Sequence, residues 1–250
     1  MKYLRILRLV LILLIFFYVL ERINVITISF LDDVMHYVFN VIILLLSFLV
    51  FVPILSAIKL KRYKPEYAEE IQSILKELDP NSYIEIKITK HFLPNNAAVF
   101  YQGNRPVMIF GEKLVNKFNK EQLKFIIAHE ISHIKNNDVE KNVISFITVI
   151  AIIPVILVLL APLIISSFSL ILGISIAIVI FLSGFVLHFY FSQKRELAAD
   201  RFALSYVDKK VALGVLHELK KMDSLPEKSF SLFATHPSVK KRVKSILTYE

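Results

Sequence analysis

The segment 129–133, which reads HEISH, holds the residues of this sequence best suited to chemistry. On a helix, side chains at positions i and i+4 project from one face, so His129 and His133 could bind one metal ion through their ring nitrogens. Glu130 is rotated by about 100° from His129, where its carboxylate could reach a water molecule on the metal. The spacing therefore predicts a zinc site in which Glu130 is the general base.

A catalytic zinc ion generally has three protein ligands and leaves a fourth position for water. The chain has no cysteine, so each ligand must be a histidine or a carboxylate. Beyond the histidine pair the sequence offers five candidates: Glu196, Asp200, His217, Glu218 and His236. Spacing alone would also fit a solvated helix charge at Glu196. Asp200 lies four residues later on the same helical face, where it could accept a hydrogen bond from a ligating histidine.

The elements that must position these side chains include an uncharged stretch of 52 residues, 142–193. A transmembrane helix needs about 20 apolar residues, so this stretch fits two crossings, which we place at about 143–165 and 170–191. Two crossings return the chain to the side that it left, where His133 and Glu196 emerge at similar depth. The hairpin therefore favours Glu196 as the third ligand.

Two further apolar runs precede the histidine pair. The first is followed by charged and bulky residues at 21–24 and has no small-residue cleavage site, so we expect an uncleaved span at about 4–24. The second, at about 34–58, is followed by clustered lysine and arginine from residue 59 onward. Basic residues on both outer flanks predict that the N-terminus and the segment after residue 59 are cytoplasmic.

Composition excludes several classes of protein. Hydrophobic residues make up 56% of the 250 residues, which rules out a single soluble domain, where about 45–50% is usual. The formal net charge of +9 is typical of the basic flanks of membrane spans, and no nucleic-acid-binding module accompanies it. Without cysteine, disulfides and thiolate-bound metal clusters are also excluded.

The polar segments predict a mixed soluble domain. Apolar residues at helical spacing indicate a helix with one buried face: Ile71, Ile74, Leu75 and Leu78. Alternation over 84–88 predicts a strand, and the apolar runs 97–101 and 107–110 predict a β-hairpin. Asn119 with Gln122 three residues later predicts the capped start of the helix that carries the histidine pair.

We therefore predict a mainly α-helical membrane protein with four transmembrane helices and a cytoplasmic, mostly helical, zincin-type domain with a small β-sheet. The expected organisation is an N-terminal transmembrane hairpin at 1–64, the first part of the catalytic domain at 65–142, a second hairpin at 143–191, and the second part of the catalytic domain at 192–250.

Three sequence elements resemble the HtpX family of membrane-integrated zinc metallopeptidases, which are related to the CAAX prenyl endopeptidases. The first is HEISH with the following 134–138, IKNND, and the second is 195–201, RELAADR, after the hairpin. The third is 235–238, THPS, with Arg242 behind it. The resemblance extends over about 66–245. One departure is Ser132, where the family commonly has glycine, and both residues are small.

The resemblance implies roles for individual residues. His129, His133 and Glu196 match the ligands of one Zn²⁺ ion, and Glu130 matches the base. Asp200 matches an acidic residue that supports the zinc site. His236 and Arg242 match an element near the active site, with His236 a candidate for stabilising the oxyanion. Asn96, Ala97 and Ala98 match a strand edge to which substrate adds as a further strand.

The implied function is a cell-membrane endopeptidase for misfolded or membrane-associated proteins, as in protein quality control and the stress response. Two alternatives stay open: a site-specific processing protease of the CAAX prenyl type, and a non-enzymatic membrane metal-binding scaffold, in which Glu130 would have no task. His188 is expected at the membrane interface, and His36 and His91 have no partners at ligand spacing. The basic run 240–244 is expected to be solvated or to lie near anionic headgroups.

Overall fold

The computed structural model describes most of the chain from residue 69 onward: residues 69–90, 93–102, 105–222 and 236–249, besides a few single positions before residue 48. The spans expected at about 4–24 and 34–58, and with them His36 and His91, lie outside these residues. The described chain is mainly helical with one small sheet, as the sequence predicts. It divides into two compact units, 1–60 with 143–185 and 61–142 with 186–250.

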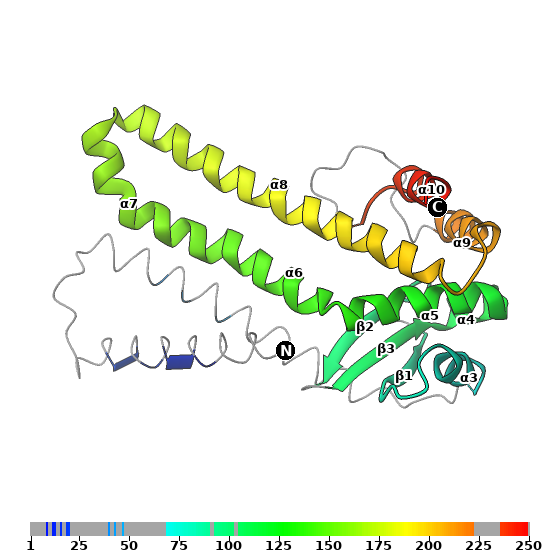
Figure 1. Ribbon diagram of the computed structural model, residues 1–250. Helices are drawn as coiled ribbons and strands as arrows, with labels where there is room; N and C mark the ends of the chain where they lie inside the picture. The colour runs from blue at the N-terminus through cyan, green and yellow to red at the C-terminus, as the bar shows by residue number, and fades with distance from the viewer. Residues whose placement is uncertain are drawn as a thin grey trace. The chain divides into compact units, whose positions relative to one another are not determined.

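Figure 1 labels the described elements. In chain order they are α3 (Glu69–Leu78), β1 (Glu85–Thr89), β2 (Ala97–Gln102), β3 (Arg105–Gly111), α4 (Glu112–Lys117), α5 (Lys120–Lys135), α6 (Asp138–Ile147), a π-helical turn (Thr148–Ile152), α7 (Ile153–Ser167), α8 (Leu170–Ala203), α9 (Lys209–Lys221) and α10 (Val239–Leu247).

The unit formed by 61–142 and 186–250 contains every residue expected at the site. Its three strands are ordered β1-β3-β2, with β1 parallel and β2 antiparallel to β3. Helix α5 packs against α3, β2 and α9, and α9 packs against α10. The fully buried core includes Met108 and Phe110 of β3, Phe125 and Ile127 of α5, and Leu216 of α9. This arrangement leaves β2 at one edge of the sheet beside α5.

Local patterns in this unit are confirmed. All four apolar residues expected on the buried face of α3 are buried, and the predicted strands form β1, β2 and β3. The predicted connection 102–106 is shorter in the structure, because Gln102 and Arg105 still pair across the hairpin. Asn119 and Gln122 form a reciprocal capping box at the start of α5. This cap fixes where the helix with the histidine pair begins.

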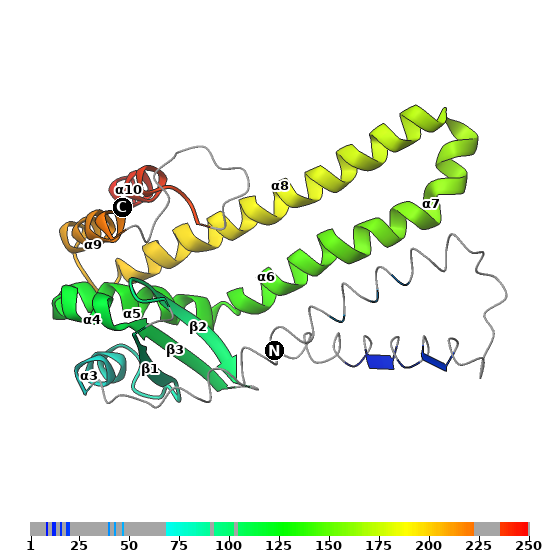
Figure 2. The same ribbon diagram turned by 180° about the vertical axis from the view of Figure 1, so that it is seen from behind.

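The unit formed by 1–60 and 143–185 contains a helical hairpin. The chain runs from α6 through the π-helical turn into α7, reverses at residues 168–169, and returns as α8 (Figures 1 and 2). Packing at two levels shows the antiparallel arrangement: Gly173 of α8 faces Ile164, and Gly184 faces Val149 and Ile153.

Two helical segments of this hairpin are long and apolar enough to cross a membrane, Asp138–Val158 and Leu170–Ala203, with mean hydropathies of 2.3 and 2.8. Only 17% and 11% of their most apolar stretches are buried among the described residues. A core helix of a soluble protein would be mostly buried. These segments are therefore candidate spans, and they overlap the two crossings expected at about 143–165 and 170–191.

Candidate metal centre

Helix α5 presents His129, Glu130 and His133 from a rigid position. The capping box sets its first turn, and its buried side chains anchor it in the core. His129 and Glu130 are themselves only 7% and 8% exposed. Ser132, which precedes His133, is buried, and its hydroxyl accepts a hydrogen bond from Asn136 where the helix ends. Helix α5 therefore fixes the backbone positions from which these three side chains project.

Glu196 of α8 meets both histidines. Its carboxylate oxygens lie 3.6 Å from His129 Nε2 and 3.4 Å from His133 Nε2, and the two Nε2 atoms are 3.2 Å apart. Donor atoms of these three residues lie within 4.8 Å of one another, so the cluster could hold a metal ion. Donors at about 2.1 Å from a tetrahedral zinc ion are about 3.4 Å apart, and the 3.2 Å between the two Nε2 atoms is close to that value.

A carboxylate lies behind each histidine. His129 Nδ1 is 3.0 Å from Asp200 Oδ1, and His133 Nδ1 is 2.9 Å from Asp138 Oδ2. With each Nδ1–H donating to its carboxylate, both Nε2 lone pairs would be available to a metal ion held between the histidines and Glu196. Both carboxylates are buried, with Asp200 0% and Asp138 4% exposed. The two histidines therefore have fixed orientations.

Asp138 is a residue of the site that neither motif spacing nor family resemblance indicates. It reaches His133 because α5 stops at Lys135, Asn137 adopts a left-handed backbone with φ of 53°, and α6 begins at Asp138 itself. Asparagine often ends a helix in a left-handed conformation, and aspartate is favoured in the first turn of a helix. The sequence NND at 136–138 could therefore have indicated that one helix ends and another begins just after His133.

Arg242 of α10 secures Asp200. Its Nε and Nη2 atoms donate to Asp200 Oδ2 and Oδ1 at 2.8 and 2.5 Å, and both residues are buried. Burial alone would raise the pKa of Asp200, but the guanidinium charge and the hydrogen bonds from Arg242 and His129 lower it to about 2. Asp200 is therefore ionised and accepts hydrogen bonds from two sides.

His236 reaches the cluster from the segment before α10. Its Nδ1 lies 2.9 Å from Glu196 Oε2, and its side chain is 47% exposed. Burial would raise the pKa of Glu196, yet hydrogen bonds from His129, His133 and His236 hold that pKa well below its usual value. For His133, burial lowers the pKa, but the hydrogen bonds to Asp138 and Glu196 prevail and raise it to about 10. The cluster is thus organised around charged carboxylates.

A cleft of about 390 Å³ opens beside this cluster. Glu130 and the three candidate ligands line one side. The strand β2 and the residue before it line another, including the expected Asn96, Ala97 and Ala98. Among the described residues β2 pairs only with β3, so its outer edge is available to a further strand. Apolar side chains complete the wall: Leu93, Leu114, Phe125, Ile126 and Leu219.

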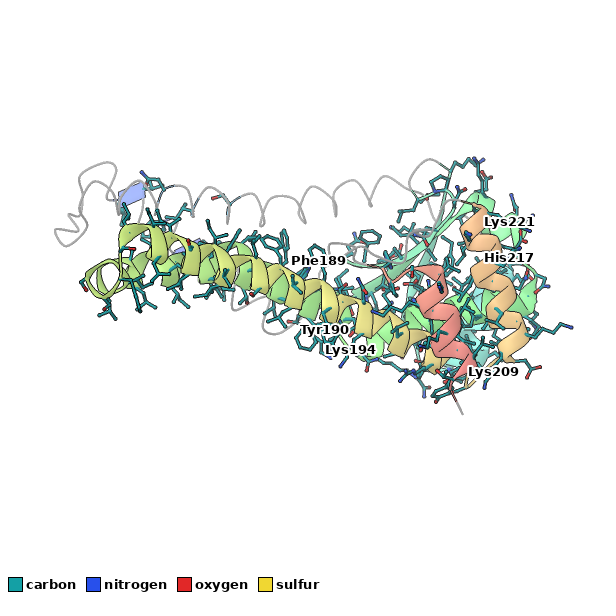
Figure 3. All side chains as sticks on the ribbon, turned by 90° about the horizontal axis from the view of Figure 1, so that it is seen from above. Phe189, Tyr190, Lys194, Lys209, His217 and Lys221 are labelled. Carbon is teal, nitrogen blue, oxygen red and sulfur yellow. The ribbon has the colours of Figure 1, made fainter. Side chains whose placement is uncertain are left out.

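Other candidate residues lie apart from the cluster. His217 is exposed on α9, on the helix that also carries Lys209 and Lys221 (Figure 3). Glu218 pairs with Lys221 at 2.7 Å and with Lys117 at 3.4 Å. His188, expected at the membrane interface, is buried on α8 beside Phe189. The site is therefore formed by α5, α8, the start of α6 and the segment 236–242.

Comparison with known proteins places this geometry in context. The sequence model of Peptidase family M48 matches residues 65–250. A protein named Protease HtpX homolog from Thermoanaerobacter pseudethanolicus is 25% identical over 211 residues, covering 69% of this chain and 64% of the relative. A protein of the same name from Bacteroides fragilis is 26% identical over 167 residues, covering 52% of each chain.

The matches do not extend over whole relatives. A Protease HtpX homolog from Desulfatibacillum aliphaticivorans is 29% identical over 89 residues, which cover 34% of this chain and 29% of the relative. This chain thus spans less than two thirds of these relatives' length. Among solved structures, S. mikatae Ste24p superposes with a TM-score of 0.56 at 18% identity, covering 79% of this chain and 56% of Ste24p, which indicates a shared fold.

Proposed function

Because the chain belongs to Peptidase family M48, whose model matches residues 65–250, we propose that it is a membrane-bound, zinc-dependent endopeptidase. The observation that carries the proposal is the meeting of His129, His133 and Glu196 beside Glu130 in one cleft. The proposed substrates are misfolded or membrane-associated proteins.

The donor set fits zinc. Two imidazoles and one glutamate form one of the common three-residue sets of catalytic zinc sites. His129, His133 and Glu196 would hold the ion, because one donor atom from each lies within 4.8 Å of the others. When bound, zinc supplies Lewis acidity, which polarises a peptide carbonyl and acidifies water.

The chain's own residues supply the proton transfers. Glu130 lines the cleft next to His129, where its carboxylate takes a proton from the attacking water and delivers it to the leaving amine. Asp200 and Asp138 hold the histidines so that their Nε2 atoms face the cleft. His236 contacts Glu196 through Nδ1, and with both ring nitrogens carrying hydrogen its Nε2 would donate to the substrate oxyanion.

The sheet edge supports an extended peptide as the substrate. Strand β2 runs along the cleft with one edge unpaired among the described residues, and Ala97 and Ala98 have small side chains there. A peptide added to this edge would form backbone hydrogen bonds that do not depend on its side chains. Such binding suits a protease that acts on many unfolded sequences.

Membrane attachment follows from the apolar hairpin. We propose that α6 to α8 cross the membrane twice, that spans at about 4–24 and 34–58 add two crossings, and that the catalytic unit is cytoplasmic. The long apolar helices and the basic flanks support this topology. Glu196 follows the uncharged stretch by only three residues, so the site would lie at the membrane surface, close to membrane-protein substrates.

A site-specific processing protease of the CAAX prenyl type is the second candidate, and the fold shared with Ste24p is compatible with it. Incubation of the detergent-purified chain with unfolded casein and with a prenylated C-terminal peptide separates the two. We expect casein cleavage that a chelator abolishes and added zinc restores. Cleavage of the prenylated peptide alone, at one bond, would refute the quality-control function. Stoichiometric zinc binding without cleavage of either substrate would support the non-enzymatic metal-binding scaffold instead.

A further inference from the structure

Within about one turn, the sequence of helix α8 changes from uncharged and apolar to charged. Its uncharged run ends at Gln193, and the preceding Tyr190 and Phe191 are 47% and 48% exposed. Lys194 follows, with its Nζ 4.9 Å from the centre of the Tyr190 ring, and Figure 3 shows these two residues together on α8. Exposed aromatic side chains beside a lysine are typical of the boundary between lipid and water. If α8 crosses the membrane as proposed, its boundary would lie at residues 190–194.

Helix α10 contacts α8 next to these residues. Lys241 Nζ donates to Gln193 Oε1 at 2.9 Å, while farther along the two helices Arg201 Nε donates to Ser245 Oγ at 3.3 Å. The side chain of Lys241, in the first turn of α10, therefore reaches Gln193 of α8. Its ammonium group lies beside residues 190–194 of α8.

The exposed face of α10 is basic. Lys240, Lys241 and Lys244 are exposed, whereas Arg242 and Ile246 are buried. The helix contains no acidic residue, and within the described parts of the chain no carboxylate pairs with these lysines or with Lys194. Positive charge in the first turn opposes the helix dipole, so helix stability does not account for these residues.

We propose that Lys194, Lys240, Lys241 and Lys244, here called the basic rim, bind the anionic headgroups of membrane phospholipids. The proposal rests on the proposed crossing by α8 and on no catalytic step. Each lysine near an anionic bilayer surface raises the affinity of the protein for that surface about fivefold, and the fold-changes of several clustered lysines multiply. The adjacent exposed aromatic side chains favour lipid over nucleic acid or an acidic peptide as the partner.

This contact would also act on the site. Arg242 lies on the buried face of α10 and holds Asp200, which in turn contacts His129. Headgroups bound to the basic rim would therefore stabilise the helix that supports one of the histidines.

The cysteine-free chain permits a direct test in nanodiscs. A donor dye is attached to Thr248→Cys at the exposed end of α10, and transfer is measured to headgroup-labelled phosphatidylglycerol or phosphatidylcholine. We compare the triple variant Lys194→Gln/Lys240→Gln/Lys241→Gln with a matched triple on α9, Lys209→Gln/Lys210→Gln/Lys220→Gln. The two variants lose the same charge from exposed positions. Zinc stoichiometry verifies that each one is folded.

We expect transfer to phosphatidylglycerol to exceed transfer to phosphatidylcholine severalfold in wild type and in the α9 triple, and the preference to disappear in the rim triple. An unchanged preference in the rim triple overturns the proposal, as does an equal loss in both triples. Complete competition by inorganic phosphate would indicate a soluble-anion site instead of a lipid site. The assay measures no proteolysis, so an inactive chain that retains the preference refutes the proposed function alone.

Discussion

The pair of Arg242 and Asp200 offers a quantitative test of how the site is held together. Arg242→Met keeps the length and apolar stem of the side chain but removes the guanidinium that donates two hydrogen bonds to Asp200. The carboxylate, 0% exposed, is then left with His129 as its partner. Removing one partner of a buried ion pair costs about 3–5 kcal/mol, which lowers Tm by about 6–20 °C in a chain of this size.

The assay is differential scanning calorimetry of the full chain in detergent with a chelator, so that metal binding does not contribute to stability. Arg201→Met is the matched control, because Arg201 is exposed and contacts only Ser245 and Tyr249 among the described residues. Its expected cost is below about 1 kcal/mol. The double variant Asp200→Asn/Arg242→Met removes both charges and should recover part of the loss. A Tm for Arg242→Met equal to that of the control, or strictly additive losses in the double variant, would refute the reasoning.

Three further predictions concern the cleft. Glu196→Ala should lower zinc affinity strongly in a chelator competition, and unchanged affinity would assign the third ligand elsewhere. Asp138→Ala should lower zinc affinity about 10–100-fold in the same competition, with partial rescue by Asp138→Asn, which retains a hydrogen-bond acceptor for His133. Gly111→Ala should slow casein cleavage and destabilise the chain by about 1–3 kcal/mol in calorimetry, because the new Cβ would lie 2.2 Å from the carbonyl oxygens of Pro94 and of Leu93, which lines the cleft. Wild-type cleavage and Tm would contradict it.

Local patterns in the sequence predicted the elements that carry the site. Helical spacing gave α3, alternation gave β1, and Asn119 with Gln122 gave the start of α5. The length of the uncharged stretch predicted two crossings that return the chain, and Glu196 does lie beside the histidines. These predictions depend on periodicity and on bilayer thickness, and both can be read from the sequence.

Contacts that depend on tertiary geometry could not be predicted in this way. The reach of Asp138 to His133 depends on one left-handed residue, Asn137, which no periodicity reveals. The family resemblance places Arg242 near the site, but its bidentate contact with Asp200 depends on how α10 packs against α9 and reaches α8. The contact of His236 with Glu196 likewise joins distant segments of the chain.

The central claim is that zinc held by His129, His133 and Glu196 works with Glu130 to hydrolyse peptide bonds. The most direct test measures zinc content and casein cleavage on the same detergent-purified preparations of wild type and Glu130→Gln. We predict one zinc ion per chain in both, with cleavage in wild type and none above background in the variant. Cleavage by Glu130→Gln at the wild-type rate would contradict the account.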